Sequence, residues 1–184
     1  MSPRRAAPLT LEFVLLGLLA ESPAHGYELH QKLRKLQPLA LVWNVGQAQL
    51  YALLDKLAGQ GLLSGEVFPG EHRPDRMRYS LTPAGQSRFA GWLSEPVPHA
   101  RDLRQEFLAK LYFARRQGGG PDLIARQRAA CLAWLDSLDA QYGALNPGQL
   151  DERLVFAFRL RQVRALLDWL EDAEKWVGDE QPPA

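Results

Sequence analysis

The 184-residue sequence contains one cysteine, Cys131, and four histidines. A single cysteine forms no intrachain disulfide, and one thiol with scattered histidines is a poor ligand set for a zinc cluster. The sequence also has no glycine-rich phosphate loop and no motif that pairs a nucleophile with its base. We therefore expect a protein that is not an enzyme and that needs neither a metal nor another cofactor.

Long hydrophobic runs are missing as well. The most apolar stretch, residues 9–20, is too short to span a bilayer and is interrupted by Glu12. No small-residue cleavage site follows it, which argues against a secretion signal. Its leucines and valine recur at helical spacing and predict a buried helix. The protein is predicted to be cytoplasmic, with no membrane partner.

Neither sign of charge is in excess. The chain has 22 lysines and arginines against 21 aspartates and glutamates, a formal net charge of +1. Composition therefore gives no evidence for a nucleic-acid partner, and any basic DNA-binding surface has to be local. The hydrophobic fraction of 46% is that of a folded globular protein.

The N-terminal half predicts short elements in the order helix, helix, helix, hairpin, helix. Helices are expected over about 10–20, 27–37, 46–61 and 83–94, and strands over 62–68 and 76–81. Pro38 ends the second helix and Gly61 ends the third. Thr82 and Pro83 are typical of the N-cap and first residue of a helix. This order is that of a winged helix-turn-helix, whose recognition helix lies in the DNA major groove.

The third predicted helix has an outward face suited to that role. Small side chains opposite its leucines allow a close approach to the bases. Glutamine can pair bidentately with adenine, and tyrosine or lysine can reach phosphates. The residues predicted to contact DNA from this helix are Gln47, Gln49, Tyr51 and Lys56. Asp55 argues against this assignment, because a carboxylate repels phosphates.

The hairpin tip, residues 69–75, is the predicted wing. Arginines on such a loop suit a phosphate or a narrow minor groove. The wing residues predicted to contact DNA are Arg73, Arg76 and Arg78. Glu71 and Asp75 dilute the positive charge, and a solvated loop is the alternative interpretation.

Four stretches together resemble the PadR family of transcriptional regulators. They are LTLEFVLLGLLAESPAHGYEL, WNVGQAQLYALLDKLAGQGLL, RMRYSLTPAGQSRFAGWL and RDLRQEFLAKLYFA, and they cover most of residues 9–113. The resemblance implies a winged-helix DNA reader, usually a repressor, that works as a homodimer. It adds Tyr27 and Lys32 of the second helix to the expected DNA contacts. Gly46 stands where relatives often have serine, and Asp55 where a basic residue is common, so weaker phosphate contacts are expected.

The C-terminal half is predicted to be helical, with helices over about 101–116, 122–145 and 149–176. The last helix carries apolar residues at heptad spacing, and a helix that is apolar on two sides must be buried on two sides. The seam predicted to hold a dimer is Phe156, Leu160, Val163, Leu167 and Leu170. A three-helix core without a partner is the alternative.

Tryptophans of the C-terminal half suggest a second role. The PadR-family resemblance implies sensors of phenolic acids or planar drugs, and aromatic surfaces stack such ligands. The candidate effector residues are Trp134, Trp169 and Trp176. Core or dimer packing is the preferred interpretation of these tryptophans, and Cys131 is expected to be a small buried hydrophobe.

These features together predict a mainly α (α+β) protein. Residues 1–95 are expected to form a winged helix-turn-helix with a two-stranded wing, and residues 96–184 a helical dimerisation and effector domain. The predicted function is a homodimeric regulator, preferably a repressor, of a near-palindromic operator in double-stranded DNA. A small aromatic effector would release it. The alternative is an interaction or adaptor module, or a ligand sensor, that does not bind DNA.

Overall fold

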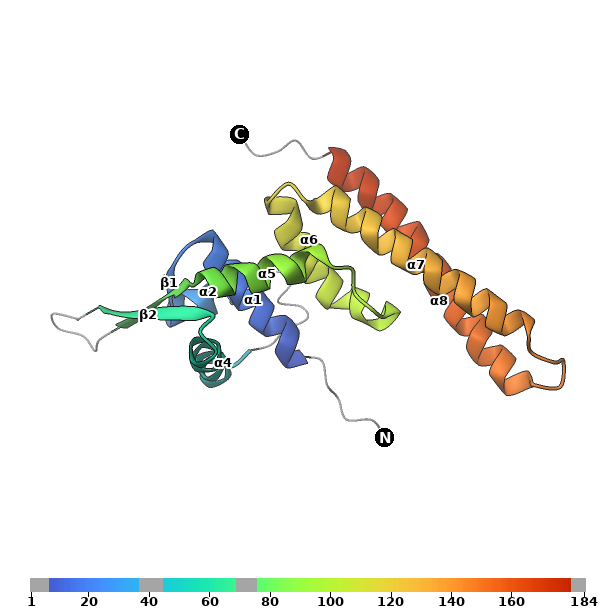
Figure 1. Cartoon of the computed structure of the whole chain (residues 1–184), viewed down its shortest axis with the longest axis horizontal. Coiled ribbons are helices and arrows are strands. Elements are labelled where there is room, and N and C mark those ends of the chain that lie inside the picture. The colour runs from blue at the N-terminus through green and yellow to red at the C-terminus, as the bar shows by residue number, and fades with distance from the viewer. Residues whose placement is uncertain (1–6, 37–44, 69–75, 180–184) are drawn as a thin grey trace. The chain divides into compact units, whose positions relative to one another are not determined.

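The computed structural model describes residues 7–36, 45–68 and 76–179 (Figure 1). The chain divides into two compact units, Met1–Ser94 and Glu95–Ala184. Each unit has its own buried apolar residues. No helix within the described residues is both long enough and apolar enough to cross a bilayer.

The first unit has the predicted order of elements. Its described helices are α1 (Ala7–Glu21), α2 (Gly26–Lys35), α4 (Gln47–Gly59) and α5 (Pro83–Ser94). Its strands are β1 (Ala24–His25), β2 (Leu63–Phe68) and β3 (Arg76–Leu81). All but β1 lie within a few residues of the predicted bounds, and β2 and β3 form an antiparallel hairpin.

The sequence does not predict β1. This two-residue strand lies between the first two predicted helices, and it pairs with β3 so that Ala24 is opposite Tyr79. The sheet order is therefore β1-β3-β2. Two residues are too few to show an alternating pattern. The root of the wing is thus three-stranded, although its hairpin has two strands.

One face of α4 is buried in the core of the first unit. The four α4 leucines predicted to point inward, Leu50, Leu53, Leu54 and Leu57, are all buried. The central helix α1 contributes fully buried leucines and a valine, and its Phe13 stacks on Trp92 of α5 with ring centroids 4.7 Å apart. Each buried leucine contributes roughly 1.5–3 kcal/mol, so α4 is firmly anchored on this side.

The start of α5 locks the hairpin in place. Thr82 accepts a hydrogen bond from the backbone N–H of Gly85 at 3.1 Å and donates one to the carbonyl oxygen of Gly61 at 2.7 Å. A Cβ atom on Gly85 would lie 2.1 Å from the carbonyl oxygen of Leu62. Only glycine permits this approach. The start of α5 therefore packs directly against the residues that join α4 to the hairpin.

The second unit begins with a feature that differs from the sequence prediction. Residues 101–116 are not one helix: a short 3-10 helix η1 (Ala100–Arg104) precedes α6 (Glu106–Arg116). Leu103 and Phe107 are buried on either side of the break. Their spacing of four would also place them on one side of a continuous helix, so the pattern does not reveal the break. The neighbouring Leu108 is exposed.

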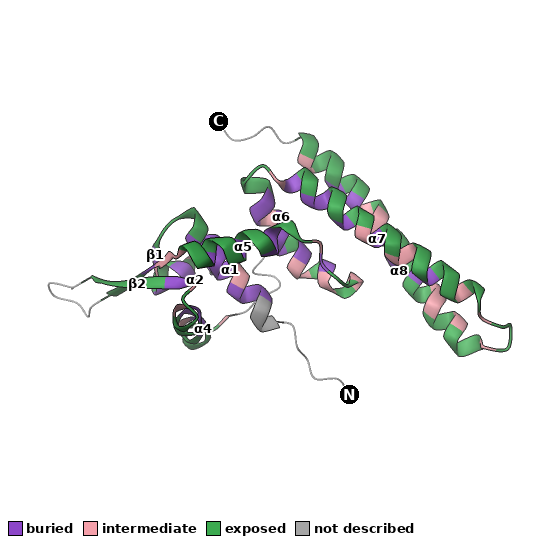
Figure 2. Ribbon diagram, viewed as in Figure 1, coloured by how far each residue is buried: buried purple, intermediate pink, exposed green. Residues whose placement is uncertain are grey.

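The rest of the second unit is an antiparallel hairpin of α7 (Gly120–Gly143) and α8 (Leu150–Asp179). Figure 2 shows buried residues where the two helices meet and exposed residues along their outer sides. Cys131 is completely buried there, and burial raises the pKa of its thiol. The thiol is therefore part of the helix packing.

The predicted dimer seam lies inside this hairpin. Leu160, Val163 and Leu170 are at most 4% exposed in the single chain, and Phe156 and Leu167 are half-buried. These residues pack within the single chain, and their assignment to a dimer contact stays a prediction. The physical reason for this packing is that α7 covers this side of α8, which the heptad pattern alone does not reveal.

Candidate nucleic-acid interface

The outward face of α4 is open to solvent. Gln47, Ala48, Gln49 and Ala52 are all exposed, while the leucines of the same helix are buried. The helix begins after Gly46, whose backbone is extended (φ −69°, ψ 151°). The first backbone N–H groups of the helix have no side-chain cap and suit an anion such as a phosphate.

Tyr51 is held in place by a glycine of the neighbouring helix. A Cβ atom on Gly26, the first residue of α2, would lie 2.6 Å from Cε1 of Tyr51 and 3.1 Å from its hydroxyl oxygen. Any larger residue at position 26 would collide with the ring. The absence of a side chain on Gly26 therefore leaves the space that the Tyr51 phenol occupies.

A groove of about 740 Å³ surrounds this contact. It is lined by His25, Gly26, Tyr27, Glu28, Gln31, Tyr51, Arg76 and Met77. Three predicted DNA contacts, Tyr27, Tyr51 and Arg76, thus come together from α2, α4 and β3. Gln31 donates a hydrogen bond to the Tyr27 hydroxyl. Phenols and a guanidinium in one groove can bind the oxygens of a phosphate backbone.

Arg78 belongs to a second cluster, at the root of the wing. Its guanidinium lies over the ring of Phe68, 5.8 Å from the centroid. The Nδ1 of His25 donates to the carbonyl oxygen of Met77 at 3.1 Å, and the His25 ring meets Phe68 edge-on. The backbone N–H of His25 donates to Glu28 at 2.8 Å, which caps α2. Arg78 is therefore an anchored cation; Arg73 lies outside the described residues.

Two predicted phosphate contacts are engaged within the unit. The ammonium of Lys56 donates to the nearly buried Glu12 of α1 at 2.7 Å. Lys32 donates to the hydroxyl of Ser22 at 3.1 Å. Neither lysine lines the groove. Lys56 thus links α4 to α1, and Lys32 links α2 to the residue that follows α1. The Lys56 side chain is half-exposed.

Tyr79 of β3 is buried and lies close to α4, whose Asp55 and Tyr51 affect its phenol. Burial raises the pKa of its phenol, and the charges of Asp55 and Tyr51 add to this effect. The Tyr79 side chain is therefore a neutral phenol in the core. Asp55 is exposed, so its repulsion toward phosphates stays a feature of this face.

Sequence reasoning missed three residues of the interface: Gly26, His25 and Gln31. The one local signal is the spacing of four between Tyr27 and Gln31, which places both on one side of a helix. The contact of Gly26 with Tyr51 joins positions 25 residues apart and has no counterpart in local spacing.

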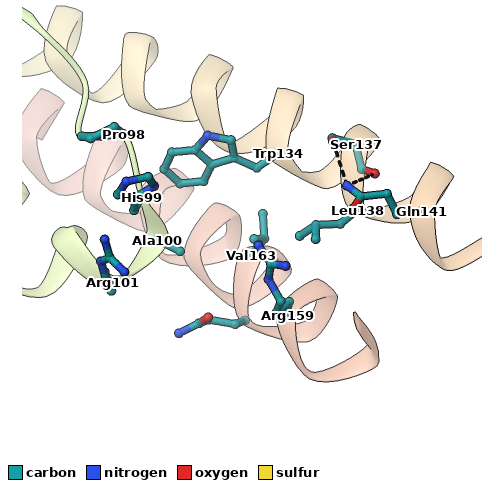
Figure 3. Close-up of a pocket in the computed structure, with 11 residues that line it drawn as sticks. Pro98, His99, Ala100, Arg101, Trp134, Ser137, Leu138, Gln141, Arg159 and Val163 are labelled. Carbon is teal, nitrogen blue, oxygen red and sulfur yellow. Dashed lines mark hydrogen bonds between the residues drawn. The ribbon is translucent and has the colours of Figure 1, made fainter. Parts of the chain in front are cut away.

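The tryptophans do not form one site. Trp134 lines a hollow in the second unit (Figure 3), whereas Trp169 meets Phe107 edge-on with centroids 6.1 Å apart. Trp176 is 62% exposed on α8. The described residues contain no group of three histidine, cysteine, aspartate or glutamate side chains that could hold a metal ion.

Comparison with known proteins finds that the chain is similar to transcriptional regulators. The model of the transcriptional regulator PadR-like family matches residues 15–91. The chain is 24% identical over 174 residues to the negative transcriptional regulator PadR of Bacillus subtilis, covering 88% of this chain and 93% of that protein. It is 23% identical over 191 residues to a probable transcriptional regulator of Mycobacterium tuberculosis, covering 94% of this chain and 100% of that one.

Solved structures are similar as well. The structure of Bacillus subtilis PadR in complex with operator DNA has 25% identity and a TM-score of 0.46, over 91% of this chain and 98% of that chain. The same protein in complex with p-coumaric acid has 24% identity and a TM-score of 0.40, over 96% of this chain and 99% of that chain.

Proposed function

We propose that this chain is a PadR-like transcriptional regulator and that its first unit binds double-stranded DNA through α4 and the groove beside it. The observation that carries this proposal is the placement of Tyr51 by Gly26. It brings Tyr51 beside Tyr27 and Arg76, next to the exposed glutamines of α4. An exposed polar face on a helix anchored by leucines is the surface that a major groove accepts.

The roles divide by chemistry. Gln47 and Gln49 read base edges, because amides both donate and accept hydrogen bonds. Backbone phosphates are bound by phenols and guanidiniums, which position the protein on the duplex. The phosphate-binding set in this proposal is Tyr27, Tyr51, Arg73, Arg76 and Arg78. Lys32 and Lys56 contribute less, because their ammonium groups are engaged with Ser22 and Glu12.

We place the dimer contact on the outer side of α8. Leu154 and Phe158 are 60% and 67% exposed and are four residues apart, so they share one face. Leu150, Val155 and Trp176 are also more than half exposed. Large apolar side chains concentrated on one helix are typical of a surface that a partner covers. The partner in this proposal is a second copy of the chain.

The proposed activity is repression of a near-palindromic operator by this homodimer. Two-fold symmetry presents the recognition helix twice, which requires two matching half-sites. The Bacillus subtilis relative is named a negative regulator, which supports the sign of the effect. We also propose that the protein acts in the cytoplasm and that a small aromatic effector releases it from DNA.

The test is a mobility-shift titration with the intergenic DNA upstream of the protein's own gene and a scrambled duplex. Tyr51→Ala is expected to weaken binding to both duplexes, because a phosphate contact carries no sequence information. Gln49→Ala is expected to reduce the preference for the specific duplex by about 1–3 kcal/mol at the affected base.

Gln86→Ala, at an exposed position of α5, is the control and is expected to leave both affinities unchanged. Equal losses on both duplexes for Gln49→Ala would contradict base reading. Failure of the unmodified protein to retard any duplex would favour the adaptor or ligand-sensor alternative.

A further inference from the structure

The outermost line of α4 consists of three very small residues and one carboxylate. Ala48, Ala52, Asp55 and Gly59 follow one another in steps of four, three and four residues, which places them on a single side of the helix. All four are exposed, and they lie opposite the buried leucines of the same helix. A major groove that receives α4 therefore meets this line first.

The carboxylate of Asp55 has no cation to hold it. Within the described residues, no hydrogen bond or ion pair engages Asp55. The adjacent Lys56 donates to Glu12 at 2.7 Å instead. Tyr79, whose pKa is raised partly by the charge of Asp55, is a buried phenol and carries no positive charge. Asp55 therefore presents an uncompensated negative charge at the centre of the outward face.

The size of the neighbouring residues determines what this charge can reach. An aspartate side chain is short, so it meets a base edge only where the helix backbone comes close to the floor of the groove. Ala48 and Ala52 permit that approach, and a Cβ atom on Gly59 would have open space around it. The line thus brings the Asp55 carboxylate toward base edges, which lie deeper in the groove than the phosphates.

The chemistry of the bases then selects a partner. A carboxylate only accepts hydrogen bonds, and the donors in the major groove are the amino groups of cytosine and adenine. The adenine amino group lies beside N7, an acceptor that repels a carboxylate, whereas cytosine offers its N4 donor with no such acceptor on the same base. A hydrogen bond to an ionised acceptor is also stronger than one between neutral groups.

We infer that Asp55 is a specificity-determining residue whose carboxylate accepts a hydrogen bond from the N4 amino group of one cytosine in each half-site. The inference rests on the function proposed above, because it requires α4 to lie in the major groove. It also gives the repulsion of phosphates a consequence: Asp55 lowers the affinity for sequences that have no donor at this position. The same charge thus disfavours wrong sequences and favours the right one.

The first experiment selects bound duplexes from a pool with randomised positions, using the full chain. The unmodified protein is expected to enrich a two-fold symmetric sequence with one strongly preferred cytosine in each half-site. Asp55→Ala should lose the preference at that position alone, and Asp55→Asn should change it to adenine, because an amide pairs with the N6 and N7 of adenine. Asp136→Ala, at an exposed carboxylate of α7, is the control and should enrich the original sequence.

The second experiment measures affinities by fluorescence anisotropy on the selected duplex. Replacing the preferred cytosine by N4-methylcytosine keeps the pairing with guanine but blocks the amino group in the major groove. The unmodified protein is expected to bind this duplex about tenfold more weakly, and Asp55→Ala to bind both duplexes equally. Asp55→Ala should also reduce the ratio of specific to scrambled affinity by about tenfold.

The outcomes separate this inference from the proposed function. No enrichment by the unmodified protein would refute both. An enriched sequence whose cytosine preference persists in Asp55→Ala, or that has no such cytosine, would refute the role of Asp55 and leave DNA binding by α4 standing. An equal gain of affinity for specific and scrambled DNA in Asp55→Ala would mean that the carboxylate only repels DNA, which also refutes the inference. Circular dichroism spectra confirm that the variants are folded.

Discussion

Gly26 shows how one residue without a side chain positions a functional group. The Tyr51 ring occupies the space that a Cβ atom at position 26 would need, with only 2.6 Å between them. The ring is thereby placed in the groove that also holds Tyr27 and Arg76. We therefore expect DNA affinity to depend on Gly26, although Gly26 acts only through the position of Tyr51.

We predict that Gly26→Ala weakens binding to specific and scrambled DNA alike, by about five- to tenfold, because the displaced phenol loses its phosphate contact. Fluorescence anisotropy measures the affinities. Gly91→Ala is the matched control: Gly91 is an exposed helical glycine with open space around it. It should gain about 0.5–1 kcal/mol of stability with no change in DNA affinity. Unchanged binding by Gly26→Ala would show that the Tyr51 position is unimportant.

Lys56 and Arg76 are both basic, yet the structure gives them different surroundings. Arg76 lines the groove, whereas Lys56 is paired with Glu12. We predict that Arg76→Gln lowers the slope of log affinity against log salt by about one, the value expected for one lost phosphate contact. Lys56→Gln should leave that slope unchanged and cost about 1–3 kcal/mol of stability, since Glu12 loses its partner. An equal change of slope in both variants would contradict this distinction.

At the scale of elements, α8 has two apolar sides with different uses. One side, with Leu160, Val163 and Leu170, is buried against the hairpin partner α7. The other, with Leu154 and Phe158, is exposed in the single chain. The first side should control the stability of the unit and the second its association.

We predict that the double variant Leu154→Glu, Phe158→Glu is monomeric and keeps its helix content, because charges on an exposed face disrupt only the contact with a second copy. Leu160→Glu should instead lower the free energy of unfolding by more than about 3 kcal/mol, because it buries a charge between α7 and α8. Light scattering and denaturant titration measure the two effects. Dimers that persist in the double variant would rule out the outer face of α8 as the contact.

At the scale of the whole molecule, the proposed dimer sets the geometry of the operator. Two recognition helices related by two-fold symmetry contact half-sites about one turn of DNA apart, or a multiple of it. Inserting about five base pairs between the half-sites should abolish dimer binding, and inserting about ten should restore much of it, because only whole turns return both half-sites to one face. Mobility shifts on such duplexes measure this. Equal binding to all spacings would mean that each chain binds independently.

Much of the fold follows from the sequence because its signals are local. The leucine spacing of α4, the Thr82 cap and the strand-like composition of β2 and β3 each depend on residues within a few positions. The motifs also predicted a resemblance to the PadR-like family, and the model of that family matches residues 15–91. The break at Gln105 escaped prediction because Leu103 and Phe107 keep helical spacing across it.

Tertiary structure decided how these elements are used. Which side of α8 is covered depends on α7, and whether Lys56 is available depends on Glu12, 44 positions away. The groove beside α4 exists because Gly26 lets Tyr51 approach α2. Periodicity thus determined which residues lie on a common face, because this follows from helix and strand geometry alone. What each face contacts was decided only by packing between segments distant in the chain, since local spacing carries no information about them.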